Sequence, residues 1–132
     1  MPRSPRCDDY RMAVMYSAQV LDYFQNPRGV GEVENATVSV EVQNPACGDV
    51  MRLSLRVIEG KIEEVKFRAQ GCVPSIACGS RLVEMLQGLT VEQAARVRRE
   101  DLVEGVGGLP EASQHAGHLA LDALKLALAK IG

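Results

Sequence analysis

The sequence predicts an α+β domain in which a three-stranded antiparallel sheet carries helices packed on one face. Three segments between residues 37 and 69 alternate apolar and polar residues, which is the period of strands with one buried face. The segments before and after them repeat apolar residues every three or four positions, as amphipathic helices do. A helix, three strands and then several helices is the order expected when helices are laid on a single sheet.

The first helix is predicted over residues 10–25, where apolar residues recur at helical spacing. Pro27 and Gly29 end it, because proline disfavours helix in the residue before it and glycine suits a turn. Residues 1–9 are predicted to be a flexible N-terminus, and residues 10–132 a single domain.

Three strands are expected next, over residues 37–43, 51–57 and 65–69. Their apolar faces consist of Val38, Val40 and Val42, then Met51, Leu53, Leu55 and Val57, then Val65, Phe67 and Ala69. Glu59-Gly60 is predicted to form a tight turn into the third strand. The result is an antiparallel meander with one face in water.

Helices resume after Gly71. Pro74 suits the first turn of a helix that ends before Gly88, and Thr90 with Gln93 predicts a capping box for a short helix to about Arg98. Residues 105–110 are expected to be a flexible connection, and residues 111–130 the last helix. In that helix the predicted buried stripe is Leu121, Leu124, Leu128 and Ile131, with Ala120, Ala123 and Ala127 allowing close approach.

Composition excludes several classes of function. The 132 residues include 15 lysines and arginines against 17 aspartates and glutamates, so no basic face is expected for nucleic acid or an anionic membrane. No apolar run is long enough for a membrane span, and none follows the N-terminal arginines as in a signal peptide. We therefore expect a cytoplasmic protein, whose four cysteines are reduced thiols for metal or sulfur chemistry.

Chemistry-bearing residues gather at three places. Cys47 and Asp49 lie in the loop between the first two strands, and Cys72 lies where the third strand turns into a helix. Helical N–H groups there are expected to lower the pKa of the Cys72 thiol. His115 stands near the start of the last helix, with His118 three residues on.

Two thiolates, a carboxylate and an imidazole drawn from separate loops would fill a tetrahedral shell for zinc or iron. Each residue also has a simpler interpretation. Cys78 is as well explained by core packing as by ligation, and His118 is more often a solvated helix residue than a ligand. The chain has no Cys-x-x-Cys pair of a zinc ribbon or thioredoxin-type site.

Four motifs follow one another along the chain: residues 16–31 (YSAQVLDYFQNPRGVG), residues 45–51 (PACGDVM), Gly71-Cys72, and Leu109-Pro110 with His115. With these motifs, in this order, the sequence resembles the IscU/NifU-type iron–sulfur cluster assembly scaffolds. The resemblance implies a non-enzymatic carrier that takes iron and sulfur from a cysteine desulfurase, holds a labile [2Fe–2S] cluster and passes it to apo acceptor proteins. It also implies Cys47, Asp49, Cys72 and His115 as ligands.

One departure from the family pattern concerns the ligand set. Ala116 follows His115, where the family usually has a third cysteine; Cys78 and His118 are candidates to replace it. Residues 109–113 also lack the lysine of the family's chaperone-docking segment, which leaves use of an Hsp70-type chaperone open.

Two further hypotheses remain. A zinc-binding structural or regulatory module of the same fold would use the same ligands without building clusters, and acid-labile sulfide separates the two. A cysteine-dependent enzyme is less favoured, because no general base lies near either thiol in the sequence.

Overall fold

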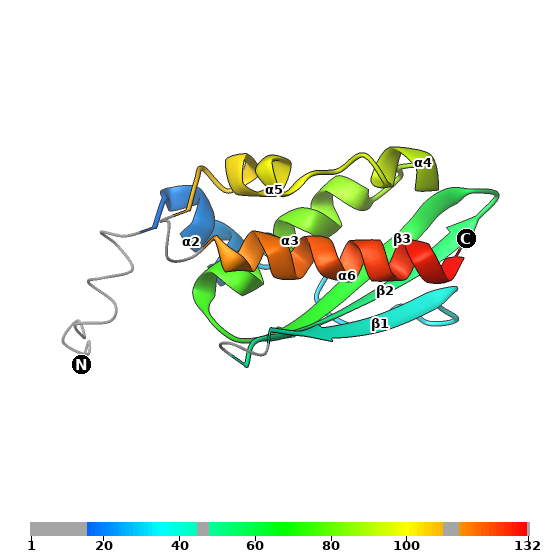
Figure 1. The fold of residues 1–132 in the computed structure, drawn as a ribbon, viewed down its shortest axis with the longest axis horizontal. Helices are drawn as coiled ribbons and strands as arrows, with labels where there is room; N and C mark the ends of the chain where they lie inside the picture. Colours follow the sequence, from blue (N-terminus) through cyan, green and yellow to red (C-terminus); the bar gives the residue numbers. More distant parts are fainter. Residues whose placement is uncertain (1–15, 45–47, 110–113, 132) are drawn as a thin grey trace.

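The computed structural model describes residues 16–44, 48–109 and 114–131. Its elements are α2 (Ala18–Gln25), β1 (Val38–Gln43), β2 (Val50–Ile58), β3 (Lys61–Gln70), α3 (Val73–Leu86), α4 (Val91–Ala94), α5 (Arg99–Gly105) and α6 (His115–Ile131). The sheet is antiparallel in the order β1-β2-β3, and α3 and α6 lie across one of its faces (Figure 1). This confirms the predicted α+β class and sheet.

The β2–β3 hairpin is built on the two-residue turn that the sequence predicts. Glu59 and Gly60 both adopt positive φ, at 52° and 75°, as a turn that matches the twist of the strands requires. A bulge follows, because Arg56 pairs with Glu64 but Val57 pairs with Ile62. The extra residue lets Ile62 share the buried face with Val65 and Phe67 although it lies three positions before Val65.

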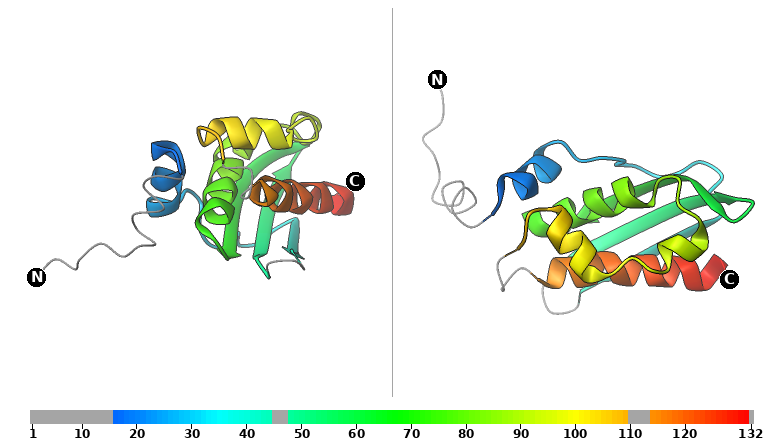
Figure 2. Two further views of the ribbon diagram at one scale, coloured as in Figure 1. Left: turned by 60° about the vertical axis from the view of Figure 1, so that its left-hand side comes forward. Right: turned by 90° about the horizontal axis from the view of Figure 1, so that it is seen from above.

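The main core lies between the sheet and the helices. α3 packs on β3, α6 packs on β1 and β2, and α5 contacts both helices (Figure 2). The largest fully buried side chains come from all of these layers and include Phe67, Met51, Leu53, Leu82, Leu102 and Leu124. A single core therefore joins the strands to the three helices that cover them.

The opposite face of the sheet is polar but partly covered. The segment after α2 bonds to the outer edge of β3, where Gly31 N–H donates to the carbonyl of Phe67. It then crosses to β1, and Val33 N–H donates to the hydroxyl of Ser54, 3.0 Å away, which is buried. The alternation predicts that this face is exposed to water. Arg52 and Arg68 are exposed as predicted, whereas Ser54 is buried.

The first predicted helix is too long at its N-terminal end. Residues 10–15 lie outside the described part of the chain, and residues 16 and 17 are not helical. Ser17 is the N-cap of α2: its hydroxyl accepts from Val20 N–H at 3.0 Å and donates to the carbonyl of Val106. A serine that looks like part of a helical stripe is therefore a cap, because its hydroxyl satisfies an N–H group that the first turn leaves open.

The helix predicted from Thr90 to about Arg98 is shorter in the structure, and a second helix follows it. The Thr90–Gln93 capping box is present, but α4 stops at Ala94. Arg98 is the N-cap of α5, a helix that was not predicted, and its N–H donates to the carboxylate of Asp101 at 2.9 Å. Glu100 and Asp101 in the first turn of α5 were the available signal, because acidic residues favour a helix start.

The buried face of α6 contains the three predicted alanines and one of the predicted leucines. Ala120, Ala123, Ala127 and Leu124 are at most 1% exposed, whereas Leu121, Leu128 and Ile131 are only partly buried. Small residues bring the helix axis close to the sheet, and the longer side chains then cover the flanks. The predicted start of this helix, residue 111, lies outside the described residues. No helix in the described part is long and apolar enough to cross a bilayer.

Close packing of α3 on the sheet depends on Gly79, and this gives a test of the fold. A Cβ atom at Gly79 would lie 2.7 Å from the Phe67 ring and 3.0 Å from Met51. Overpacking costs about 1–3 kcal/mol, while alanine gains about 1 kcal/mol of helix propensity over glycine. We expect Gly79→Ala to lower the free energy of unfolding by up to about 2 kcal/mol, measured by urea denaturation.

The matched control is Gly117→Ala in α6. A Cβ atom there meets mainly the flexible side chain of Arg99, at 3.0 Å, so the same gain in propensity should be largely retained. A Gly79→Ala protein as stable as the Gly117→Ala protein would contradict this account of the helix–sheet packing.

Candidate metal centre

The strand register brings two of the predicted site residues together. Val50 at the start of β2 pairs with Gln70 at the end of β3, so Asp49 and Gly71 flank the same end of the sheet. Cys72 follows as the N-cap residue of α3, and His115 is the first residue of α6. Three residues that are far apart in the sequence thus meet because β2, α3 and α6 all begin at the same end of the sheet.

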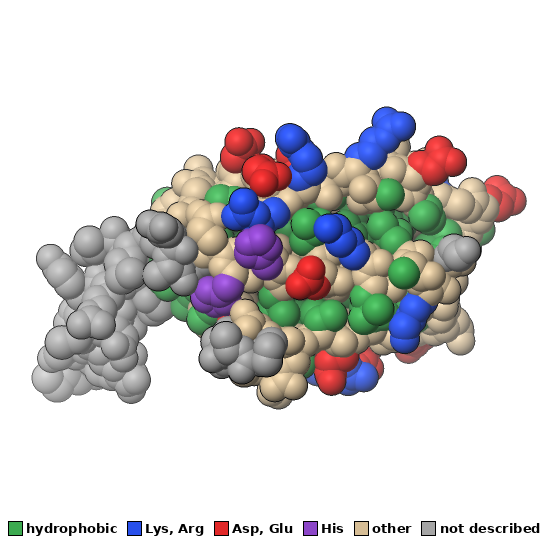
Figure 3. All heavy atoms as spheres, viewed as in Figure 1, with side chains coloured by type: hydrophobic (Ala, Val, Ile, Leu, Met, Phe, Trp, Pro, Cys, Tyr) green, Lys and Arg blue, Asp and Glu red, His purple; other side chains and the backbone are tan. Residues whose placement is uncertain are grey.

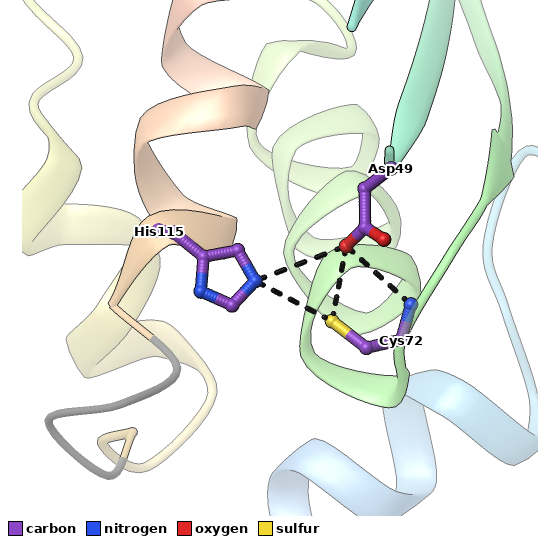
Figure 4. A group of neighbouring side chains, drawn as sticks. All are labelled: Asp49, Cys72 and His115. Atoms are coloured by element: carbon purple, nitrogen blue, oxygen red, sulfur yellow. Dashed lines mark hydrogen bonds and ion pairs between the residues drawn. The ribbon is translucent and has the colours of Figure 1, made fainter. Parts of the chain in front are cut away.

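The side chains of Asp49, Cys72 and His115 point toward one another (Figure 4). One carboxylate oxygen, Oδ2 of Asp49, lies 3.2 Å from Sγ of Cys72 and 3.8 Å from Nε2 of His115, and Sγ and Nε2 are 3.7 Å apart. One ligand atom from each residue lies within 4.8 Å of the other two. Asp49 is buried, while Cys72 and His115 are partly exposed, so the group has an open side.

Asp49 also serves the N-terminus of α3. Cys72 occupies the N-cap position without a side-chain capping bond, and its N–H points at Oδ2 of Asp49, 3.5 Å away. Gly71 is needed for this approach, because a Cβ atom there would lie 2.5 Å from the Asp49 carboxyl carbon. A carboxylate beside a helix start is favourable, since the N–H groups and the dipole of the helix attract negative charge.

The prediction that the helix start lowers the pKa of the Cys72 thiol is wrong. Its pKa is raised above the ordinary 9.0, mainly because the half-buried thiol loses hydration, and the neighbouring Asp49 carboxylate adds to the rise. The hydrogen bond with Ser75 works in the opposite direction but is the weaker influence. The N–H groups at the start of α3 therefore interact mainly with the carboxylate of Asp49. With its raised pKa, Cys72 is a thiol at neutral pH in the metal-free protein.

Cys78 and His118, the two candidates to replace the third cysteine, are not part of this group. Cys78 is fully buried in the main core, and burial raises its pKa to about 12. His118 is exposed and lines a shallow crevice with Asn44 and Asp122. Among the described residues, the cluster of potential metal ligands consists of Asp49, Cys72 and His115 alone. Cys47 lies outside the described residues, two positions before Asp49.

Ala116 stands where the resemblance would place a third cysteine. Ala116 directly follows His115 at the start of α6 and is fully buried in the main core. Its methyl group is thus part of the packing between α6 and its neighbours, while the adjacent histidine is partly exposed at the site.

Ser75 is a site residue that the sequence analysis did not single out. It is fully buried in the first turn of α3, and its hydroxyl donates to Oδ2 of Asp49 at 2.7 Å. The hydroxyl also lies 3.3 Å from Sγ of Cys72. A serine three residues after a cysteine at a helix start was a weak signal, because the reach of its hydroxyl depends on where Asp49 is placed.

The chain matches the NifU-like N-terminal domain over residues 15–131. It is 44% identical over 114 residues to an iron-sulfur cluster assembly scaffold protein IscU of Archaeoglobus fulgidus, covering 86% of this chain and 74% of that protein. It is 39% identical over 118 residues to IscU of Escherichia coli K12, covering 86% of this chain and 91% of that protein.

A solved structure has the same fold. The N-terminal part of a nitrogen-fixing NifU-like protein from Brucella abortus superposes with a TM-score of 0.74 at 17% identity, covering 89% of this chain and 94% of that one. The fold, the order of its motifs and the length of the match agree, and the chain belongs to the NifU-like N-terminal domain family.

Proposed function

We propose that this protein is a scaffold for iron–sulfur cluster assembly. The observation that carries the proposal is the convergence of Asp49, Cys72 and His115 at one end of the sheet, in a chain whose relatives are named as such scaffolds. The cluster is cargo, built from iron and from sulfur supplied by a cysteine desulfurase. It is then passed to apo acceptor proteins in the cytoplasm.

The donor types suit cargo that must leave. Thiolates are the usual ligands of iron–sulfur clusters, and a carboxylate or an imidazole is a harder, weaker ligand for them. Cys72 and Cys47 would supply the thiolates, with Asp49 and His115 completing the set around a labile [2Fe–2S] cluster. The role is that of a carrier and not of an enzyme.

Access to the site supports delivery to partners. Cys72 and His115 are partly exposed, and both histidines of the chain are visible on the molecular surface in Figure 3. Because Cys72 and His115 are partly exposed, a donor or acceptor protein can approach these two ligands without opening the core.

Zinc binding is the second candidate function. Three ligand atoms within 4.8 Å of one another, one of them a thiol, also suit a single zinc ion. A structural or regulatory zinc module would keep the metal and contain no sulfide, so the two functions differ in a measurable product.

Anaerobic reconstitution with ferrous iron, cysteine and a cysteine desulfurase tests the scaffold proposal. We expect near-equal iron and acid-labile sulfide per chain together with visible absorbance. Cys72→Ala and Cys47→Ala should each abolish these signals, because the cluster loses a thiolate. Tight zinc without sulfide in the unaltered chain would instead support the zinc module, and a cluster retained in either variant would remove that cysteine from the ligand set.

Cys78→Ala separates core packing from ligation. Because Cys78 is fully buried among core side chains, we expect this variant to form the same amount of cluster as the unaltered chain. Its free energy of unfolding should fall by roughly 0.5–1.5 kcal/mol, as when other small buried groups are removed. Loss of cluster in a folded Cys78→Ala protein would show that Cys78 replaces the missing third cysteine.

Zinc affinity should rise with pH. The metal binds a thiolate, so Cys72 must release its proton on binding, and its pKa lies above 9.0 in the metal-free protein. Below that pKa we expect about tenfold tighter binding per pH unit for each proton released, and the rise should continue past pH 9. Chelator competition at several pH values measures it; an affinity independent of pH between 7 and 9 would contradict thiolate ligation.

A further inference from the structure

Ser75 is placed to act on the metal centre without being a ligand. It is the third residue of α3 and is fully buried. Of the hydrogen bonds described to Oδ2 of Asp49, the one from the Ser75 hydroxyl is the shortest at 2.7 Å, against 3.2 Å from the Cys72 thiol and 3.5 Å from the Cys72 N–H.

The oxygen that Ser75 holds is the one that faces the other ligands. Oδ2 forms a triangle with Sγ of Cys72, 3.2 Å away, and Nε2 of His115, 3.8 Å away, so a metal at the centre would use this oxygen. A carboxylate oxygen has two lone pairs and can accept a hydrogen bond from a hydroxyl while it binds a metal. The thiol proton of Cys72 is lost on metal binding, and the bond from Ser75 does not depend on that proton.

We propose that Ser75 is a positioning residue that fixes the rotation of the Asp49 carboxylate and so keeps Oδ2 directed at the metal. The inference rests on the proposed function only in taking Asp49 as a ligand. Removing a group that forms a hydrogen bond to a metal ligand typically lowers the metal affinity by about 10–100-fold. Ser75 therefore helps to set how tightly this site grips iron or zinc.

Ser80 is a matched control on the same helix. It too is fully buried in α3, but its hydroxyl accepts from the backbone N–H of Arg28 at 2.7 Å. Ser75→Ala and Ser80→Ala thus each remove one buried, hydrogen-bonded hydroxyl from α3, and only the first alters a contact with Asp49.

The test measures zinc affinity of the full-length chain by chelator competition, with Zn²⁺ alone and no sulfur source. We expect Ser75→Ala to weaken binding about tenfold and Ser80→Ala to leave it unchanged. In an Asp49→Ala background, Ser75→Ala should have no further effect, because the group through which it acts is gone. Visible absorption bands of bound Co²⁺ should shift in Ser75→Ala and not in Ser80→Ala.

Three outcomes would overturn the proposal: unchanged affinity in Ser75→Ala, an equal loss in Ser80→Ala, or the same loss with and without Asp49. If Ser75→Ala does not fold, Ser75→Thr keeps the hydroxyl and should retain the affinity and the Co²⁺ spectrum; a folded threonine variant with a tenfold loss also counts against it. Failure of the unaltered chain to bind zinc or cobalt would reject the site itself. Zinc binding that depends on Ser75 through Asp49, with no sulfide formed on reconstitution, would reject the scaffold function alone.

Discussion

The carboxylate of Asp49 accepts hydrogen bonds from the thiol of Cys72 and the hydroxyl of Ser75, where β2 begins and β3 passes into α3. It is buried, so these donors replace the water that it loses. The contact joins the β1–β2 loop to the start of α3, and it places the thiol of Cys72 beside the carboxylate. Both the local fold and the proposed site depend on it.

The same contact has opposite effects on structure and on ligation. In the metal-free protein the negative charge of Asp49 suits the start of α3, but it helps to raise the pKa of the Cys72 thiol. A metal ion reverses this second effect, because a cation between the two groups favours both as anions. The metal-free site is therefore held by hydrogen bonds among groups that a metal would convert into ligands.

The helices determine what lies near this centre. α6 packs closely on β1 and β2 through its alanines, which brings His115 to the end of the sheet where Asp49 and Cys72 lie. α3 carries both Ser75, which bonds to Asp49 in the first turn, and Cys78, which lies one turn further along and is buried in the core. One helix thus contributes a thiol to packing and a hydroxyl to the site.

The sequence alone determined the class of fold, the three strands, the β2–β3 turn and the residue types of the site, because these follow from local periodicity, turn chemistry and short motifs. It did not determine that Ser17 is a cap, that α5 exists, or that Leu121, Leu128 and Ile131 of α6 are only partly buried. Those features depend on which surface each element meets. The convergence of Asp49, Cys72 and His115, the raised pKa of Cys72 and the role of Ser75 were decided by tertiary structure, since each arises from groups that only the strand register and the helix packing bring within hydrogen-bonding distance.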